Sequence, residues 1–227
     1  MSVYDSRLYM DALCGAGDAA CSQPFRDCRA QASAAISSNY LEYEHETTLF
    51  VIDVQNEYFD GALPITGRDQ SLHKICQLMD ASKKAGIPRI VVQHTMTSPD
   101  MPIFQQGSAS WALHPEIASR GSEYQIEKNL PGSFTGTNVE QWLRKEGVDT
   151  VVIAGYMTHM CCDTTAREAV HRGFKVEFLS DATGTLPLDN AGGKVTAEEL
   201  QRSILAAQQH LLSEVISADE WLKRVAL

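Results

Sequence analysis

The sequence is short of positive charge. It has 19 lysines and arginines against 29 aspartates and glutamates, so its formal net charge at pH 7 is −10. A surface that binds nucleic acid or an anionic membrane needs clustered positive charge to offset the charge of the phosphates. We therefore expect neither nucleic acid nor a membrane as a partner.

Long apolar runs and targeting signals are also lacking. No stretch approaches the ~18 apolar residues that a membrane-spanning helix needs. The N-terminal stretch carries Asp5, Arg7, Asp11 and Asp18, which is too much charge for a secretory leader. In a chain of 227 residues without such a leader, the six cysteines are typical of reduced thiols rather than of disulfides. Together these features predict a cytoplasmic protein.

What the sequence does have is a regular alternation of strand and helix patterns. Strands are expected at 48–53, 89–94, 124–128, 150–154, 175–179 and 215–216, and helices at about 69–85, 137–146, 160–172, 196–212 and from 218 onward. Such alternation predicts a three-layer α/β/α fold around a mainly parallel, Rossmann-like central sheet. We expect this domain to span 45–227 and to follow an N-terminal arm or short helices at 1–44.

Two charged side chains stand at the ends of strand patterns. Asp53 follows the apolar run 49–52, so it is expected at the carboxyl end of a buried parallel strand, where α/β proteins bind ligands. The alternative is that Asp53 only caps the next turn. Lys128 ends the short alternating strand at 124–128, and a solvated surface lysine is the alternative there.

A cysteine stands at the start of a helix pattern. Cys161 belongs to the segment 155–167, which follows the β-branched run 150–154 and precedes an apolar helical stripe. Unpaired N–H groups and the positive end of the helix dipole would favour a thiolate at this position. The alternative is that Cys161 and Cys162 are two small buried apolar side chains.

Together these three segments resemble the isochorismatase-like cysteine hydrolase superfamily, which includes nicotinamidases, N-carbamoylsarcosine amidases, ureido hydrolases and isochorismatases. The resemblance rests on D-x-Q-N at 53–56, on E-K followed by P-x-x-F within 127–134, and on G-x-x-T-x-x-C-x-x-x-T-A-R at 155–167. It covers about residues 45 to 220. The family's catalytic triad falls on Asp53, Lys128 and Cys161. Cys162 stands where the family usually has a small apolar residue, so we expect it to serve packing.

The resemblance also implies a mechanism. Asp53 is expected to act as the general base for Cys161, while Lys128 keeps Asp53 ionised and adds positive potential beside the sulfur. Cys161 would attack a carbonyl carbon and form a thioester, which water then hydrolyses. The family's oxyanion donors fall on the backbone N–H groups of Met157 and Cys161, with a cis peptide bond between Tyr156 and Met157.

Five residues are candidates for the wall of a substrate pocket: Gln55, Trp111, Phe134, Tyr156 and His159. Trp111 lies in a long loop at 95–124, and loops of this length usually serve as lids or pocket walls. For the large aromatic side chains, a place in the core is the alternative.

A metal site is not expected. Nicotinamidases hold a metal with an Asp-x-His pair and a distal histidine, whereas this chain has Gln93 and His94 after its second strand, with no such pair. His159, Cys161 and Asp163 are too close in sequence to form a tetrahedral zinc site by themselves. We expect no cofactor, and we interpret His94, His114 and His159 as candidates for hydrogen bonding in or near the pocket.

Three functions remain as hypotheses. The first is a cysteine hydrolase that cleaves a C–N bond in a small amide, carbamoyl or ureido compound. The second is an isochorismatase, which cleaves a vinyl ether and needs no cysteine nucleophile, and the third is a catalytically idle scaffold of the same fold. Because the family usually forms dimers or tetramers, we also expect a homo-oligomer that uses the surface near the Cys161 helix and the 95–124 loop.

Overall fold

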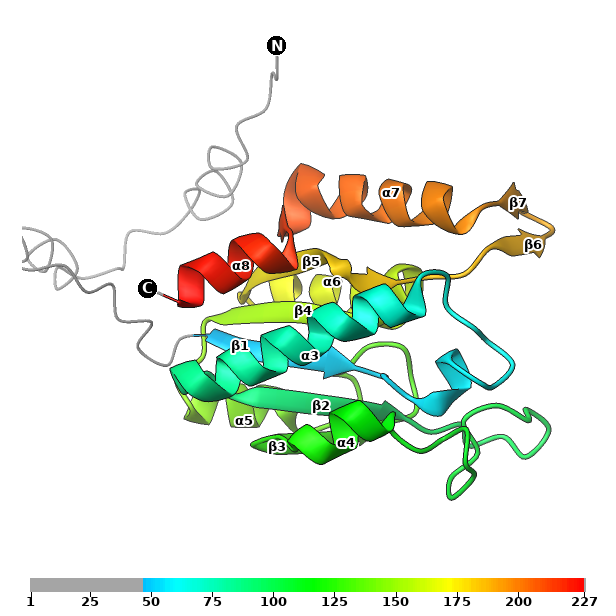
Figure 1. The fold of residues 1–227 in the computed structure, drawn as a ribbon, viewed down its shortest axis with the longest axis horizontal. Helices are drawn as coiled ribbons and strands as arrows, with labels where there is room; N and C mark the ends of the chain where they lie inside the picture. Colours follow the sequence, from blue (N-terminus) through cyan, green and yellow to red (C-terminus); the bar gives the residue numbers. More distant parts are fainter. Residues whose placement is uncertain (1–46, 227) are drawn as a thin grey trace, which may run out of the picture. The chain divides into compact units, whose positions relative to one another are not determined.

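The computed structural model describes residues 47–226, and the arm predicted at 1–44 lies outside this range. Six parallel strands form the central sheet, in the order β3-β2-β1-β4-β5-β8 (Figure 1). Their bounds are β1 (Thr47–Ile52), β2 (Arg89–His94), β3 (Tyr124–Lys128), β4 (Thr150–Tyr156), β5 (Lys175–Gly184) and β8 (Glu214–Ile216). The predicted parallel α/β sheet is therefore confirmed.

Helices cover both faces of this sheet. They are α3 (Arg68–Ala85), α4 (Pro115–Arg120), α5 (Val139–Lys145), α6 (Asp163–His171), α7 (Ala197–Ala207) and α8 (Ala218–Val225). Successive side chains of a strand point to opposite faces, so β1 supplies Leu49 and Val51 to one core and Phe50 and Ile52 to the other. The first core is closed by α3, α4 and α8, and the second by α5 and α6. The fold thus has the three layers that the alternating pattern predicts.

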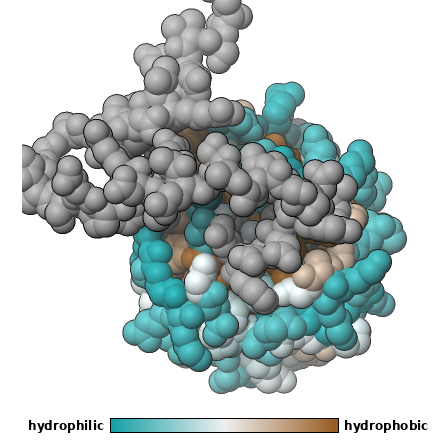
Figure 2. All heavy atoms as spheres, turned by 90° about the vertical axis from the view of Figure 1, so that its left-hand side faces the viewer, coloured by the Kyte–Doolittle hydropathy of each residue, from teal (hydrophilic) through white to brown (hydrophobic). Residues whose placement is uncertain are grey.

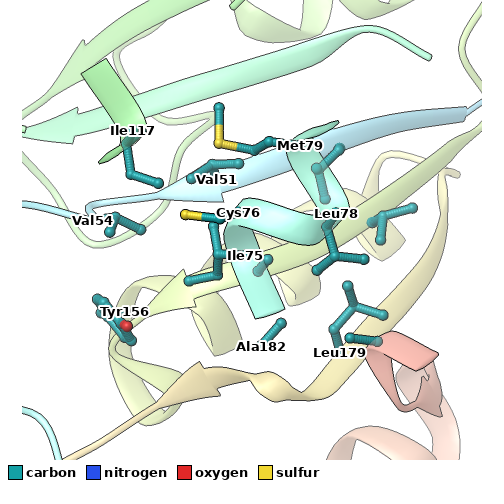
Figure 3. Close-up of a cluster of buried hydrophobic side chains, with 14 of the residues drawn as sticks. Val51, Val54, Ile75, Cys76, Leu78, Met79, Ile117, Tyr156, Leu179 and Ala182 are labelled. Carbon is teal, nitrogen blue, oxygen red and sulfur yellow. The ribbon is translucent and has the colours of Figure 1, made fainter. Parts of the chain in front are cut away.

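The first core is centred on α3. Ile75, Leu78 and Met79 on this helix are fully buried and lie against β1, β4 and β5 (Figure 3). Burying such a side chain is typically worth about 1.5–3 kcal/mol. The helix ends at Gly86, whose left-handed backbone (φ 73°) lets its N–H bond the last carbonyls.

Several features differ from the predicted elements, including β5, which continues to Gly184 instead of ending at 179. The 95–123 loop contains the short helix α4, which begins at Pro115 and is capped by the His114 side chain. A two-stranded antiparallel hairpin, β6 (Leu188–Asn190) with β7 (Gly193–Val195), precedes α7. The helix expected at 160–172 begins earlier, as a π-helical turn η2 (Thr158–Cys162), and the one expected at 196–212 ends in a second π-helical turn, η3 (Gln208–Leu212).

Figure 2 shows one face of the described part, seen from the left-hand side of Figure 1. Hydrophilic residues occupy much of the visible periphery of this face, and apolar residues are visible closer to its centre. Between residues 47 and 226, no helix combines the length and the apolar character needed to cross a lipid bilayer.

Candidate functional site

The sheet order brings three predicted residues to one edge. Asp53 directly follows β1, Lys128 is the last residue of β3, and Cys161 lies in the turn η2 that follows β4. Because all these strands run parallel, their carboxyl ends meet on the same side of the sheet. The strand β2 lies between β3 and β1, and it ends at His94 on the same edge.

Lys128 joins these groups. Its Nζ lies 2.8 Å from Asp53 Oδ2 and 3.2 Å from Cys161 Sγ, so it bridges the carboxylate and the sulfur. The same nitrogen lies 3.1 Å from the carbonyl oxygen of Leu130 and 3.2 Å from His94 Nδ1. The side chain of Lys128 is fully buried, so it is not a solvated surface lysine. Neither carboxylate oxygen of Asp53 accepts a hydrogen bond from the described residues, so Asp53 does not cap the next turn.

The backbone of Asp53 leaves the β-conformation abruptly. Its φ is +52°, in the left-handed region that aspartate tolerates better than most residues. Its N–H still donates to the carbonyl of Val92, at 2.9 Å, and so continues the sheet by one bond. The chain therefore turns immediately after this bond, at the edge where the Asp53 carboxylate meets Lys128.

The turn that carries Cys161 depends on a glycine. Gly155 has φ +116° and pairs with Ile52, and a Cβ there would lie 2.1 Å from the Ile52 carbonyl oxygen. The next peptide bond, between Tyr156 and Met157, is cis, as the resemblance implied. The Met157 carbonyl then accepts the N–H of Met160 at 3.0 Å and of Cys162 at 3.2 Å, which closes the first turn around Cys161.

The environment of Cys161 favours the thiol. Burial first, and then the nearby Asp53 carboxylate, raise the pKa of Cys161 against a smaller opposing effect of Lys128, and together they bring it to about 12. This differs from the expectation of a favoured thiolate, because the helix begins in a buried turn beside a carboxylate. Nucleophilic attack from this arrangement requires a base to accept the proton of the thiol.

The two basic groups next to Cys161 carry different charges. Burial lowers the pKa of Lys128, but attraction to Asp53 and Cys161 outweighs this effect and the pKa is raised. Burial and the charge of Lys128 lower the pKa of His94, against a smaller opposing effect of Asp53. At neutral pH, Lys128 is therefore a cation and His94 a neutral imidazole.

Cys162 lies in a different environment from its neighbour. It is fully buried, in the core between the sheet and α5 and α6. Burial, followed by the charges of Cys161 and Asp53, raises the pKa of this thiol well above its usual range. Its position is that of an apolar packing group.

Three of the five pocket candidates have their side chains in the core or bonded to backbone. Tyr156 is fully buried and its hydroxyl lies 2.8 Å from that of Ser71, and Phe134 stacks on Phe50 with ring centroids 6.2 Å apart. Gln55 is also fully buried. Its side chain accepts from the His94 N–H at 2.8 Å and donates to the carbonyls of His94 and Trp111, at 2.9 and 2.7 Å.

The other two candidates are partly exposed. Trp111 donates its indole N–H to Thr95 Oγ1 at 2.8 Å, which ties the 95–123 loop to the end of β2. His159 Nδ1 lies 2.7 Å from Thr185 Oγ1, and burial lowers the pKa of His159. Of the five candidates, these two retain surface that a bound molecule could contact.

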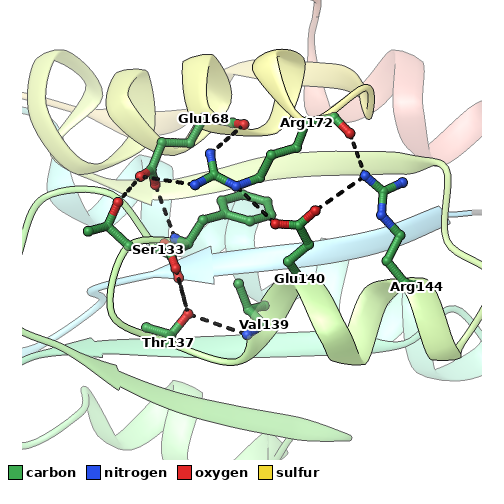
Figure 4. A network of polar contacts seen from close by, with 9 residues as sticks. Ser133, Thr137, Val139, Glu140, Arg144, Glu168 and Arg172 are labelled. Carbon is green, nitrogen blue, oxygen red and sulfur yellow. Dashed lines mark hydrogen bonds and ion pairs between the residues drawn. The ribbon is translucent and has the colours of Figure 1, made fainter.

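The loop that follows Lys128 is held by side chains that the sequence pattern did not single out. Thr165 Oγ1 accepts the Ser133 N–H at 3.1 Å. Glu168 accepts the Phe134 N–H at 3.0 Å (Figure 4). Both acceptors lie on α6, about one and two turns after Cys161. Thr165 is the threonine of T-A-R in the third motif, so that motif could have identified it from the sequence.

A separate cavity of about 680 Å³ lies between α3, the end of β5 and the start of α7. Asp69, His73, Asp181 and Glu198 are among its lining residues, whereas Asp53, Lys128 and Cys161 are not. The candidate site is therefore placed by the contacts of Lys128 and not by this cavity. Over residues 47–226, no group of three or more His, Cys, Asp or Glu side chains is arranged to hold a metal ion.

Known proteins of one kind match this chain. The Isochorismatase domain model matches residues 47–219. The secreted isochorismatase effector Isc1 of Verticillium dahliae is 31% identical, over 77% of this chain and 90% of its own length. Nicotinamidase 3 of Arabidopsis thaliana is 33% identical, over 60% and 72%. A solved isochorismatase-type protein from Burkholderia xenovorans LB400 has a TM-score of 0.78 and 42% identity, over 80% of this chain and 88% of that one.

Proposed function

Because this chain belongs to the isochorismatase family, we propose that it is a cysteine hydrolase that cleaves a C–N bond in a small amide, carbamoyl or ureido compound. The observation that carries this proposal is the bridge made by Lys128, whose Nζ contacts both the Asp53 carboxylate and the Cys161 sulfur. A nucleophile, a base and a cation that stabilises both are the parts that covalent acyl transfer requires.

In the first half of the proposed reaction, Asp53 accepts the proton of the Cys161 thiol while the sulfur forms a bond to the substrate carbonyl carbon. The carbonyl π electrons move onto its oxygen, giving a tetrahedral oxyanion. The C–N bond then breaks, the leaving nitrogen takes the proton from Asp53, and the acyl group stays on Cys161 as a thioester. Throughout, Lys128 offsets the negative charge that passes between Asp53 and Cys161.

In the second half, water attacks the thioester carbon and gives a proton to Asp53. The C–S bond breaks, the sulfur regains that proton, and a carboxylic or carbamic acid leaves. Both tetrahedral states need donors for their oxyanion, for which we propose the backbone N–H groups of Met157 and Cys161. One such donor is typically worth ~3 kcal/mol of the barrier.

The exposure of Cys161 supports a small substrate. Only 7% of its surface is accessible, so a bulky or polymeric substrate would not reach the sulfur without displacing the surrounding loops. The similarity to Nicotinamidase 3 supports a carbon–nitrogen bond as the target, since that relative is named for hydrolysis of an amide. We propose no metal and no cofactor in the reaction, because Asp53, Lys128 and Cys161 supply its base, cation and nucleophile and the sequence lacks the Asp-x-His pair of nicotinamidases.

Isochorismate hydrolysis is the second candidate, favoured by the similarity to Isc1, which is named an isochorismatase. It would cleave a vinyl ether without a thioester, so it assigns no task to the buried contact between Lys128 and Cys161. The hypothesis of a catalytically idle scaffold explains the three grouped side chains least well. Such a scaffold would maintain three groups with no catalytic use, two of them ionic and fully buried, and burying charges is costly.

One panel of assays separates the three functions. Small amides, carbamoyl compounds, ureides and isochorismate are offered to the wild type, to Cys161→Ala and to Cys162→Ala as the matched control. We expect turnover of a compound with a C–N bond, its loss in Cys161→Ala, and its retention in Cys162→Ala. Turnover of isochorismate alone, undiminished in Cys161→Ala, would establish the second function, and no turnover of any compound would favour the scaffold.

We further propose that the protein is a cytoplasmic homo-oligomer. Met101, Leu130, Met160 and Leu211 are large apolar side chains exposed by 40% or more, and Met160 adjoins Cys161 in the turn η2. Phe104, by contrast, is buried against the protein's own core and is not part of such a surface. The three cysteines of the described part, Cys76, Cys161 and Cys162, are free thiols, which agrees with a reducing compartment.

A further inference from the structure

The ammonium group of Lys128 has more partners than hydrogens. Four acceptors surround Nζ: Asp53 Oδ2 at 2.8 Å, Leu130 O at 3.1 Å, His94 Nδ1 at 3.2 Å and Cys161 Sγ at 3.2 Å. A lysine ammonium has three N–H donors and no acceptor. At any moment, one of the four contacts therefore has no hydrogen of its own.

The four acceptors differ in strength. The structure directs hydrogen bonds from Nζ to Leu130, His94 and Cys161, and it pairs Nζ with Asp53 by charge alone, so that neither carboxylate oxygen accepts a hydrogen bond within residues 47–226. A buried carboxylate 2.8 Å from an ammonium group is nevertheless the strongest of the four acceptors, so we assign one hydrogen to Asp53 and a second to the carbonyl of Leu130. The third hydrogen is then shared between His94 Nδ1 and the sulfur. A neutral thiol is a weak acceptor, whereas an unprotonated ring nitrogen is a good one, so the nitrogen prevails until the sulfur becomes charged.

We propose that His94 is a positioning residue, which accepts the third Lys128 hydrogen in the resting enzyme and yields it to the sulfur when the thiolate forms. This inference rests on the proposed function, because it takes Cys161 as the nucleophile. It gives the enzyme an unreactive thiol at rest and a cation that turns toward the sulfur only as negative charge develops there.

The surroundings of His94 hold the ring for this purpose. The Gln55 side chain accepts from the N–H of His94 and donates to the carbonyl of His94, so the backbone of His94 is held by two bonds. The ring meets Phe104 edge to face, with centroids 5.3 Å apart. Lys128 and Asp53 are the charged groups that act on the imidazole, and Lys128 is the one in contact with it. A second positive charge on His94 would be repelled, so Nδ1 stays an acceptor and Nε2 carries the proton.

The proposal predicts that removing the acceptor makes Cys161 more reactive. In His94→Leu, the third Lys128 hydrogen has the sulfur as its remaining partner, so the thiolate is stabilised. A hydrogen bond to a charged group is typically worth at least a factor of ten in an equilibrium. We expect labelling of Cys161 by iodoacetamide near pH 8 to be roughly tenfold faster than in the protein with His94.

The labelling rate is measured against pH by peptide mass mapping, with every variant made in a Cys162→Ala background so that one thiol in the segment reacts. His94→Asn is the matched control, because its side-chain oxygen keeps an acceptor near the place of Nδ1. We expect the pH profile of the control to stay close to that of the parent, and that of His94→Leu to move to lower pH. The proposal would be overturned if the pH profile of His94→Leu stays in place or moves to higher pH, or if the profiles of both variants shift equally.

A second measurement does not depend on whether His94→Leu folds. ¹⁵N correlation spectra of the wild-type imidazoles, assigned by the signal lost in His94→Asn, report which ring nitrogen carries the proton. We expect His94 to be neutral at pH 7 with Nδ1 unprotonated, and a proton on Nδ1 would contradict the inference. Both readouts are independent of substrate, so either can fail while amide hydrolysis stands, and amide hydrolysis can fail while both succeed.

Discussion

Cys161 and Cys162 are neighbours in the chain, yet the structure assigns them unlike surroundings. Cys161 meets Lys128 and Asp53 at the edge of the sheet, whereas Cys162 points into the core on the side of α5 and α6. The register of the turn η2 decides this, because the bond from the Cys162 N–H to the Met157 carbonyl fixes which side chain faces inward. One residue of slippage would place Cys162 where Cys161 now lies and would move Cys161 to the exposed position of Met160.

The raised pKa of Cys161 makes a prediction about stability. Burial, then Asp53, raises this pKa from an ordinary 9.0 to about 12 in the folded chain. Between these values the unfolded chain has lost the proton that the folded chain keeps, so stability falls as pH rises from about 9 toward 12. We expect the wild type to lose free energy of unfolding relative to Cys161→Ala by up to about 1.4 kcal/mol per pH unit in this window.

Urea unfolding at three pH values, about 8, 9.5 and 10.5, measures this difference. Titrating groups far from the site are common to both proteins and cancel in the comparison, so the difference reports Cys161 together with its effect on the pKa values of Lys128 and Cys162. A gap between wild type and Cys161→Ala that does not change with pH would show that the thiol titrates alike in both states.

Some residues could be placed from the sequence and others could not. Asp53, Lys128 and Cys161 were predicted as one site, because three motifs in order indicated a family even though each residue alone had a bland alternative. The contacts of Gln55 could not be predicted from the sequence. Its side chain bonds backbone atoms that are 39 and 56 residues away, and no local pattern contains that information. Tyr156 and Phe134 likewise could not be distinguished from pocket walls, since the same aromatic side chains serve in both places.

At the scale of elements, long periodic segments were predicted well. The strands at 89–94 and 124–128 have the predicted bounds, and α3 begins one residue before its predicted start. The short helix α4 and the β6–β7 hairpin were missed because three to six residues are too few to show a period. The π-helical turn η2 was predicted as part of an α-helix, since both have the same apolar pattern over so few residues.

The strand β4 gives a prediction of its own. At Gly155, a Cβ would lie 2.1 Å from the Ile52 carbonyl oxygen. The substituted residue would also have to adopt φ +116°. We expect Gly155→Ala to destabilise the protein by more than about 3 kcal/mol, since the clash is with backbone and the turn to Cys161 follows directly. Thermal or denaturant unfolding measures the loss.

Gly136→Ala is the matched control for Gly155→Ala. Gly136 also has a positive φ, +75°, but a Cβ there has no heavy atom within 4 Å. Its cost should be that of the backbone conformation alone, about 1 kcal/mol. If both variants lose the same stability, then close approach of β1 to β4 is not what requires a glycine at 155.

At the scale of the whole molecule, the sequence lacks the Asp-x-His pair with which nicotinamidases hold a metal, and this predicts independence from metal. Dialysis against EDTA should leave the activity of the purified protein unchanged, because in the proposed reaction Lys128 and the backbone N–H groups supply the positive charge that a metal would. Stoichiometric zinc or iron that is lost together with activity would contradict this. Restoring activity with one added metal would then identify it.

The oligomer is also a prediction at this scale. We expect the full chain to be a dimer or tetramer at micromolar concentration, measured by light scattering, because exposed side chains such as Met160 and Leu211 favour burial against a second copy. Deletion of residues 1–40 tests whether the arm contributes. A monomeric full-length protein would refute the oligomer, and a truncated protein that keeps both oligomer and activity would refute only the role of the arm.

The order of the sheet has a consequence for synthesis on the ribosome. The central strand β1 is made before the other described strands, but β4, which pairs with it from Thr47 to Ile52, is complete only at Tyr156. Until then, the nascent chain carries Asp53 next to a strand with one side unpaired. The proposed nucleophile is among the last parts of its own site to be translated, so a chain that ends before Cys161 lacks the chemistry that we propose.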